Sequence, residues 1–232
     1  MEQRIAIITG AGRGIGRATA EHLAQLGYVP VAVARTPEEI ARTIEICGRG
    51  ISVPADVSNP AEVERVVQLV LESYGRVDAL VHCAGLAPLK AVDRLTVEEW
   101  NATLATNLSA VFYFCRLLWP VWRKQGAGVV VNVSSLSSRD PFTGFSAYGA
   151  AKAGVNLLGI ELAREGAEIG VRVHTVAPGA VETGMLRSLM TPDEFPAEKT
   201  LDPAEVARVI GLCVSGELRY TSGEVIYLHK TL

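Results

Sequence analysis

The sequence predicts an α/β fold in which helices cover both faces of an open parallel sheet, the doubly wound arrangement. Short runs rich in β-branched residues alternate with longer amphipathic segments along all 232 residues. Most of the short runs are apolar at nearly every position, as expected of parallel strands buried on both faces. No repeat, low-complexity segment or linker interrupts this alternation, so a single domain is expected over residues 1–232.

Seven runs have the composition of strands, and they predict a seven-stranded sheet flanked by helices. They are 4–9, 29–34, 51–56, 78–85, 128–135, 171–179 and 224–228. The clearest helix has Val63, Val66, Val67 and Val70 at i, i+3, i+4 and i+7, and Asn59-Pro60 opens it. Ligands of such sheets bind beyond the carboxyl ends of the strands. Candidate site residues are therefore expected directly after each strand.

Composition and charge exclude several classes of function. The net charge of −3 supplies no basic field for nucleic acid or an anionic membrane. No uninterrupted apolar run approaches the roughly 20 residues of a membrane span, and the N-terminus lacks the pattern of a signal peptide. The four cysteines and four histidines have no metal-ligand or disulfide spacing. We expect a cytoplasmic protein with no metal site.

A glycine-rich loop follows the first predicted strand. In TGAGRGIG, residues 9–16, the glycines are Gly10, Gly12, Gly14 and Gly16, a spacing that differs from GxGxxG. Glycines let the backbone turn tightly and approach a pyrophosphate, which binds at the amino end of the following helix. The loop therefore predicts a dinucleotide site, with a purely structural turn as the alternative.

Together with YxxxK at Tyr148 and Lys152, this loop resembles the short-chain dehydrogenases/reductases. The resemblance covers nearly the whole chain, from Thr9 to Val225. It implies a Rossmann-type domain that carries both the nicotinamide cofactor and the substrate. Further motif positions follow the later strands: Asp56-Val57, HCAG at 82–85, Asn107, NVSS at 132–135 and APGAVET at 177–183. The implied cofactor-binding residues are Gly10, Arg13, Gly14, Ile15, Gly16, Arg35, Asp56, Val57, Ala84, Gly85, Tyr148, Lys152, Pro178, Gly179 and Thr183.

Four residues have the chemistry of ketone reduction. Tyr148 suits the proton donor, because Lys152 one helical turn later favours the phenolate. The resemblance implies that Ser135 polarises the carbonyl, that Lys152 also holds the ribose and that Asn107 positions a water. Ser135 precedes Tyr148 by 13 residues, the usual separation, although Ser134, Ser137 and Ser138 are neighbours. Asn107 could instead brace a helix. His82, where the family usually has asparagine, is interpreted as a buried hydrogen-bonded residue.

Cofactor preference is predicted from the second strand. Relatives that prefer NADH have an aspartate eighteen residues after the last loop glycine, where this chain has Ala34, and the next residue is Arg35. Arg13 adds a second guanidinium from the glycine loop, and such groups bind phosphate well. NADPH is therefore expected to be preferred over NADH.

These features predict an NADPH-dependent oxidoreductase that reduces a ketone to a secondary alcohol, with a cofactor-sensing regulator of the same fold as the alternative. The substrate is expected to be a small or acyl-linked ketone, which includes 3-oxoacyl thioesters. Gly126 and Ile169 occupy the places where carrier-protein reductases tend to have arginines, which weakens that particular reading. Residues 180–200 are expected to cover the substrate, with apolar side chains that either wall the site or seal the lid. In the family, the aromatic helix after Asn107 and the small-residue helix after Tyr148 pair across a dimer axis, so the resemblance implies a homo-oligomer, as a tetramer or else a dimer.

Overall fold

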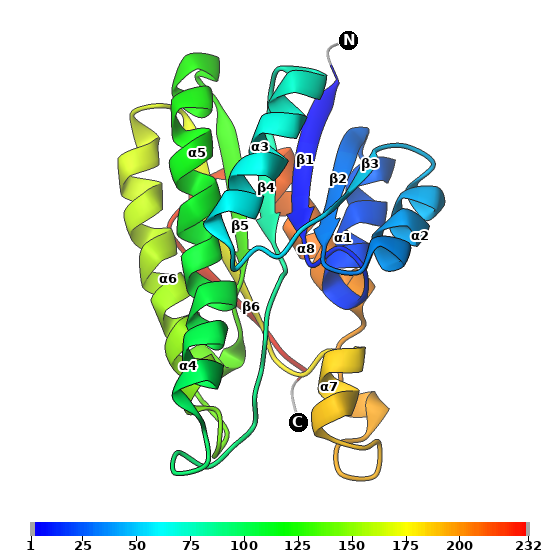
Figure 1. The fold of residues 1–232 in the computed structure, drawn as a ribbon, viewed down its shortest axis with the longest axis vertical. Coiled ribbons are helices and arrows are strands. Elements are labelled where there is room, and N and C mark those ends of the chain that lie inside the picture. Colours follow the sequence, from blue (N-terminus) through cyan, green and yellow to red (C-terminus); the bar gives the residue numbers. More distant parts are fainter. Residues whose placement is uncertain (1–2, 231–232) are drawn as a thin grey trace.

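The computed structural model describes residues 3–230, which fold around one seven-stranded parallel sheet. The strand order is β3-β2-β1-β4-β5-β6-β7, so the direction of winding reverses between β1 and β4 (Figure 1). This confirms the predicted doubly wound fold. The strands are β1 (Arg4–Thr9), β2 (Tyr28–Ala34), β3 (Ile51–Pro54), β4 (Ala79–His82), β5 (Gly128–Val133), β6 (Val171–Pro178) and β7 (Val225–Leu228).

Helices cover both faces of the sheet and enclose two apolar cores. One core lies under α3, α5 and α6 and includes Val66, Phe114 and Val155. The other lies under α1, α2 and α8 and includes Leu23 and Ile210. The helices are α1 (Gly14–Gln25), α2 (Pro37–Cys47), α3 (Pro60–Tyr74), α4 (Val97–Leu104), α5 (Ala110–Gln125), α6 (Ser146–Ala167), α7 (Gly184–Leu189) and α8 (Pro203–Ser215). Short turns of helix are η1 (Ala105–Ser109), η2 (Leu136–Ser138), η3 (Ala197–Lys199) and η4 (Arg219–Thr221).

Helix α3 begins and ends for local reasons that the sequence shows. The Asn59 carboxamide oxygen accepts a hydrogen bond from the Ala61 amide at 3.0 Å, and Pro60 occupies the first turn. Gly75 ends the helix with φ of 71°, a left-handed conformation that suits glycine. The predicted N-cap is therefore confirmed.

Several strands end earlier than expected. Strand β4 ends at His82 and β5 at Val133, whereas the apolar runs extend to Gly85 and Ser135. The remaining residues leave the sheet at its carboxyl end, where α4 and α7 project beyond the strands (Figure 1). Periodicity cannot distinguish a strand from an apolar loop that continues it.

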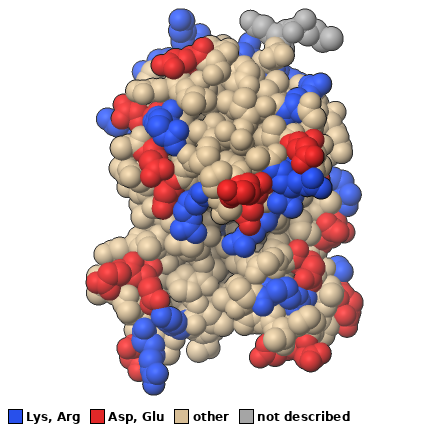
Figure 2. Space-filling view, turned by 45° about the vertical axis from the view of Figure 1, so that its right-hand side comes forward, with Lys and Arg blue, Asp and Glu red and all other residues tan. Residues whose placement is uncertain are grey.

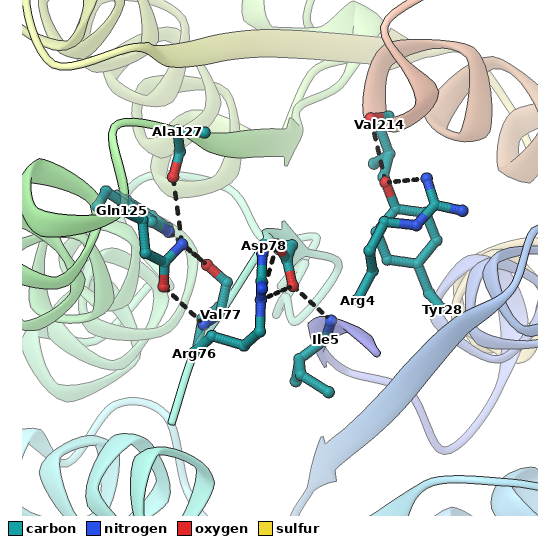
Figure 3. A network of polar contacts seen from close by, with 10 residues as sticks. Arg4, Ile5, Tyr28, Arg76, Val77, Asp78, Gln125, Ala127 and Val214 are labelled. Atoms are coloured by element: carbon teal, nitrogen blue, oxygen red, sulfur yellow. Dashed lines mark hydrogen bonds and ion pairs between the residues drawn. The ribbon is translucent and has the colours of Figure 1, made fainter. Parts of the chain in front are cut away.

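A polar network ties the strands at the opposite, amino end of the sheet (Figure 3). The Asp78 carboxylate accepts a hydrogen bond from the Ile5 amide at 2.7 Å and forms an ion pair with Arg76 at 2.6 Å. The Gln125 side chain bonds both the amide and the carbonyl of Val77, at 3.2 and 3.0 Å. These bonds join β1, β4 and α5 far from the carboxyl end, so the network belongs to the scaffold.

Residues Val97–Gln125 form one continuous helical run through α4, η1 and α5. The run is long and apolar enough to cross a membrane, by length and composition alone. In this structure it packs against α3 and α6, and Phe114, Leu118 and Trp122 have no exposed surface. The central helix of a doubly wound domain meets the same criteria, because one side of it is buried in a core.

Helix α6 packs closely on the sheet because it is rich in small residues. A Cβ atom on Gly159 would lie 2.6 Å from the Thr175 hydroxyl oxygen, and one on Gly166 would lie 2.9 Å from the Val171 Cβ. Both are closer than side-chain contacts allow. The two glycines therefore set the distance between β6 and the helix that carries Tyr148 and Lys152.

Candidate active site

A cavity of about 530 Å³ opens at the carboxyl ends of the strands. Figure 2 shows a hollow at mid-height, with basic and acidic side chains along its rim. All of the predicted cofactor-binding residues line the cavity, as do Ser135, Tyr148 and Lys152. Asn107 does not line it. Sequence spacing thus predicted a set of residues that the fold brings to one place.

The glycine loop fits the predicted dinucleotide site. Gly10 and Gly14 have φ of 64° and 54°, in the region that favours glycine. A Cβ on Gly10 would lie 2.7 Å from the Ala84 amide nitrogen, and one on Gly16 would lie 2.2 Å from the Gly10 carbonyl oxygen. Helix α1 begins at Gly14, so its free amide groups lie at the cavity wall. A turn of this kind at the amino end of a helix can hold a diphosphate group.

Thr183 closes this turn from the other side. Its hydroxyl oxygen caps α7 by accepting a hydrogen bond from the Leu186 amide at 3.3 Å. Its methyl carbon would lie 3.1 Å from a Cβ on Gly14, so the threonine lies against the glycine loop. The loop after β6 and the loop after β1 therefore meet across the cavity.

Ser135 and Tyr148 face each other within the cavity. Burial raises the pKa of Tyr148 above its usual value, and a hydrogen bond with the Ser135 side chain opposes that increase. The neighbouring serines point elsewhere: the Ser134 hydroxyl donates to the Lys152 carbonyl at 3.1 Å, and the Ser138 hydroxyl donates to the Ser135 carbonyl at 2.6 Å. The count of 13 residues therefore identified the serine that lies beside the tyrosine.

Lys152 is a buried ammonium, with 5% of its surface exposed. Its Nζ donates a hydrogen bond to the Val133 carbonyl at 2.8 Å and lies 5.7 Å from the centre of the Tyr148 ring. Burial lowers the pKa of Lys152 to about 8, while the nearby Cys83 thiol raises it. In this structure, burial is the main influence on the pKa of Tyr148.

Asn107 lies behind the cavity wall in η1, a π-helical turn, and only 2% of its surface is exposed. Its carboxamide accepts a hydrogen bond from the Leu86 amide at 3.1 Å and donates to the Leu86 carbonyl at 2.7 Å. Its oxygen would lie 2.7 Å from a Cβ on Gly85. In this arrangement the side chain braces the backbone after β4, which differs from the helix-bracing role that was the alternative.

His82 is buried below the cavity, as the sequence analysis interpreted it. Its Nδ1 lies 3.1 Å from the Thr9 hydroxyl, which also accepts a hydrogen bond from the Ala84 amide at 3.2 Å. Burial lowers the pKa of His82 to about 3, the charge of Lys152 lowers it further, and a bond with Ala110 opposes them. A neutral imidazole therefore supports the loop after β4.

Cations and carboxylates meet at the end of the cavity formed by β2 and β3. Arg13 and Arg35 are exposed, and neither guanidinium has a hydrogen bond or ion pair with a residue in 3–230. Burial tends to raise the pKa of Asp56, but hydrogen bonds from Ser58 and the charge of Arg35 hold it below its usual value. Ala34 contributes no charge. The two guanidinium groups can bind an anion at this end of the cavity.

The lid comprises residues 180–200, and a β-bridge between Val181 and Leu201 joins the chain at its two ends. The Glu182 carboxylate accepts a hydrogen bond from Arg187 Nε at 2.7 Å, and Arg187 Nη1 donates to the Phe195 carbonyl at 2.8 Å. The larger apolar side chains of the lid line the cavity, which supports the interpretation that they wall the site. They are Met185, Leu186, Leu189, Met190 and Phe195.

Other lining residues were missed by sequence reasoning. Phe142 and Phe145 border the cavity from the loop before α6, Glu39 reaches it from α2, and His229 and Lys230 border it from the chain after β7. The ring centres of Phe145 and Tyr148 lie 5.2 Å apart. An aromatic residue three positions before the tyrosine was therefore a signal that the sequence offered. Glu39 and His229 had no such signal, since tertiary packing alone brings them to the cavity.

A doubly wound sheet with a glycine cradle, a serine–tyrosine pair and a buried lysine defines a nicotinamide-dependent oxidoreductase of ketones and alcohols. The short chain dehydrogenase model matches residues 4–194, and the chain belongs to this family. It is 35% identical over 236 residues to the 3-oxoacyl-[acyl-carrier-protein] reductase of Vibrio cholerae, covering 99% of this chain and 97% of that protein. The Escherichia coli reductase of the same name is 34% identical, with coverage of 98% and 96%.

Solved structures agree with the sequence relatives. A 3-ketoacyl-(acyl-carrier-protein) reductase from Brucella melitensis, complexed with NADH, superposes with a TM-score of 0.92 at 29% identity and covers 98% of this chain and 97% of its own. A variant of actinorhodin polyketide ketoreductase with NADPH gives a TM-score of 0.93 at 27% identity, with coverage of 99% and 98%. The similarity extends over the whole fold.

Proposed function

We propose that this protein is an NADPH-dependent reductase that converts a ketone to a secondary alcohol. The observation that carries the proposal is the convergence of Ser135, Tyr148 and Lys152 on the cavity that the glycine loop borders. A nicotinamide cofactor bound there supplies the hydride. The Ser135 hydroxyl donates a hydrogen bond to the substrate carbonyl, and the Tyr148 phenol delivers the proton to the developing alkoxide.

Lys152 and Asn107 complete the proposed site. The Lys152 ammonium can hold the ribose hydroxyls of the cofactor. It can also favour the Tyr148 phenolate once the phenol oxygen lies close to the ammonium. Asn107 maintains the backbone at Gly85 and Leu86, and its proposed water-positioning role depends on that backbone. A cofactor-sensing regulator without turnover is the second candidate, but it has no need of a proton donor facing a serine.

The experiment is to replace Tyr148 by phenylalanine and to measure NADPH oxidation with a panel of ketones. Loss of a general acid lowers kcat by about 10²–10⁴-fold. Cofactor affinity should remain within about threefold, because the ring is retained. Tyr220, which is 89% exposed, provides the matched Tyr→Phe control. Near-normal turnover in the Tyr148 variant would refute the mechanism, and binding without any turnover by the unmodified protein would favour the sensor.

The proposed substrate class is a ketone with an apolar body, which includes 3-oxoacyl thioesters. The lid side chains together with Phe142 and Phe145 give the cavity an apolar wall, and the names of the relatives support the acyl group. The turns at Gly126 and Ile169 lie at the amino end of β5 and β6, where the Gly128 amide bonds the Gly170 carbonyl at 3.3 Å. Neither turn borders the cavity of its own subunit, so it cannot contact a substrate there.

The proposed preference for NADPH rests on Arg13 and Arg35, which line the cavity with no hydrogen-bonding partner among residues 3–230. Two charge-assisted bonds to a 2′-phosphate should give at least about tenfold preference in kcat/KM. The double change Ala34→Asp with Arg35→Ala should shift that preference toward NADH. Equal kcat/KM for the two cofactors in the unmodified protein would contradict the proposal.

We also propose a homo-oligomer, a tetramer or else a dimer, that pairs through α5 and α6. Phe112 and Leu157 are 51% and 62% exposed, and both border a shallow apolar groove on this face. Exposed apolar patches of this kind commonly mark interfaces. Light scattering should show an assembly that the double change Phe112→Glu with Leu157→Glu dissociates.

The four free cysteines support the proposed cytoplasmic location.

A further inference from the structure

Glu39 brings a carboxylate to the same end of the cavity as the two unpartnered arginines. It lies in the first turn of α2 and lines the cavity together with Arg13, Arg35 and Thr36. In family members that prefer NADH, the acidic residue for this task is expected at the end of β2, where this chain has Ala34. Glu39 reaches the pocket from a different element, five residues later, so motif counting does not find it.

The path of this side chain depends on Gly12. A Cβ atom on Gly12 would lie 2.7 Å from the Glu39 Oε2 and 2.9 Å from its Cβ. The glutamate therefore lies directly across the glycine loop, in a space that any larger residue at position 12 would occupy. This contact fixes the carboxylate against the loop that cradles the diphosphate.

The Glu39 carboxylate has no partner that accounts for its position. It forms no hydrogen bond or ion pair with any residue between 3 and 230. Its backbone carbonyl accepts a hydrogen bond from the Thr43 hydroxyl at 3.0 Å, an ordinary contact within a helix. A half-buried carboxylate with free acceptors, at the same end of the cavity as Arg13 and Arg35, is arranged to contact a ligand that has both hydroxyl and anionic groups.

We propose that Glu39 is a specificity-determining residue for the cofactor, which rests on the proposed use of a nicotinamide dinucleotide at this site. Its carboxylate accepts a hydrogen bond from an adenosine ribose hydroxyl and repels a 2′-phosphate. Arg13 and Arg35 attract the same phosphate. Glu39 therefore opposes the two arginines, strengthens binding of the unphosphorylated cofactor and limits the preference for NADPH.

The test uses adenosine fragments, so that it needs no ketone and no turnover. The ligands are 2′,5′-ADP, which has the 2′-phosphate, and 5′-AMP, which has the free hydroxyl. Glu39→Gln should bind 2′,5′-ADP about threefold more tightly or better than the unmodified protein, because a like charge is removed. Glu39→Ala should do the same and should also bind 5′-AMP about threefold more weakly, because the acceptor is lost.

Glu38 is the matched control. It is the other acidic residue of the same helical turn, it is exposed, and it does not line the cavity. Glu38→Gln and Glu38→Ala should change each dissociation constant by less than about twofold. The gain from Glu39→Gln should also shrink at 1 M salt, where charges are screened within about 3 Å.

The possible outcomes separate this inference from the proposed cofactor preference. If the Glu39 and Glu38 variants bind both fragments alike, the inference is wrong, whatever the arginines do. If Arg13→Ala and Arg35→Ala leave 2′,5′-ADP binding unchanged, the proposed NADPH preference fails. In that event, weaker binding of 5′-AMP by Glu39→Ala would still support the hydrogen bond to the ribose.

Discussion

Lys152 is an ammonium group held where an apolar side chain would be more stable. Its pKa is about 8 in the folded protein and is 10.5 in a free side chain, and burial is the main cause. The difference of roughly 2.5 units corresponds to about 3 kcal/mol of unfavourable free energy at neutral pH. One hydrogen bond, to the Val133 carbonyl, offsets part of it. The residue therefore persists at a cost that its proposed role in the site explains.

Lys152→Met should accordingly stabilise the fold at pH 7 by about 1–3 kcal/mol while it abolishes turnover. Below pH 8 both the folded and the unfolded chain are protonated at Lys152, so the penalty is constant. Between pH 8 and 10.5 the folded chain releases the proton first, and the unmodified protein gains stability. Urea unfolding at pH 7 and pH 10 checks this: the advantage of the variant should be large at pH 7 and mostly gone at pH 10. A variant less stable at both pH values would contradict it.

Among the larger elements, the lid is joined across its length by the Arg187 side chain, in addition to the bridge between Val181 and Leu201. Arg187 joins Glu182 near the start of the lid to the Phe195 carbonyl near its end. The Thr200 hydroxyl donates a third bond to the same carboxylate at 3.2 Å. Without Arg187, the apolar side chains between these points lose the connection that holds them over the cavity.

Arg187→Met should raise the KM for the ketone about three- to tenfold through a less ordered lid. The free energy of unfolding should change by less than about 1 kcal/mol, because the ion pair is partly exposed, at 20% and 40% of the two side chains. Arg42→Met removes an exposed pair on α2 and serves as the control. Steady-state kinetics and thermal unfolding of both variants make the comparison. Equal KM values in the two would mean that the lid is held by other contacts.

The sequence predicted those features that depend on spacing along the chain. Ser135 and Tyr148 lie together as the count of 13 residues implied, and Gly10 to Gly16 form the turn that their spacing indicated. Features that depend on packing could not be predicted from the sequence. The direction of the Asn107 carboxamide, the reach of Glu39 across Gly12 and the raised pKa of Tyr148 each depend on atoms from a distant segment.

For the whole molecule, two buried histidines make stability depend on pH. Burial lowers the pKa of His82 to about 3, as described, and burial with the charge of Arg172 lowers that of His174 to about 4, while Thr221 opposes the change. Above pH 6.5 both imidazoles are neutral in the folded and unfolded chains. Below it, the unfolded chain binds protons that the folded chain excludes, so stability falls with pH.

Each histidine should reduce the free energy of unfolding by about 1–2 kcal/mol between pH 6.5 and pH 5. His82→Asn, which replaces the imidazole by an amide that does not titrate, should flatten this dependence by about that amount. His229→Asn should leave it unchanged, because His229 is exposed. Chemical denaturation across this pH range gives the slopes. Parallel slopes in all three proteins would show that other groups cause the acid sensitivity.

Gly159 approaches Thr175 so closely that a larger residue at position 159 would tilt helix α6. The tilt would displace residues far from the contact. Tyr148 lies eleven residues away, about 16 Å at the rise of an α-helix. In Gly159→Ala, the 2.6 Å separation between the added Cβ and the Thr175 hydroxyl oxygen must increase by roughly 0.8 Å to reach ordinary contact. The helix then pivots about the tight contact at Gly166. The resulting tilt displaces the Tyr148 ring by on the order of 1 Å, which can lower kcat about 10²-fold. Alanine nevertheless raises helix propensity by about 1 kcal/mol.

Adding Thr175→Ala removes the opposing oxygen and should recover most of the lost kcat. Kinetics of the single and double variants would measure this recovery, and thermal unfolding would measure their stability.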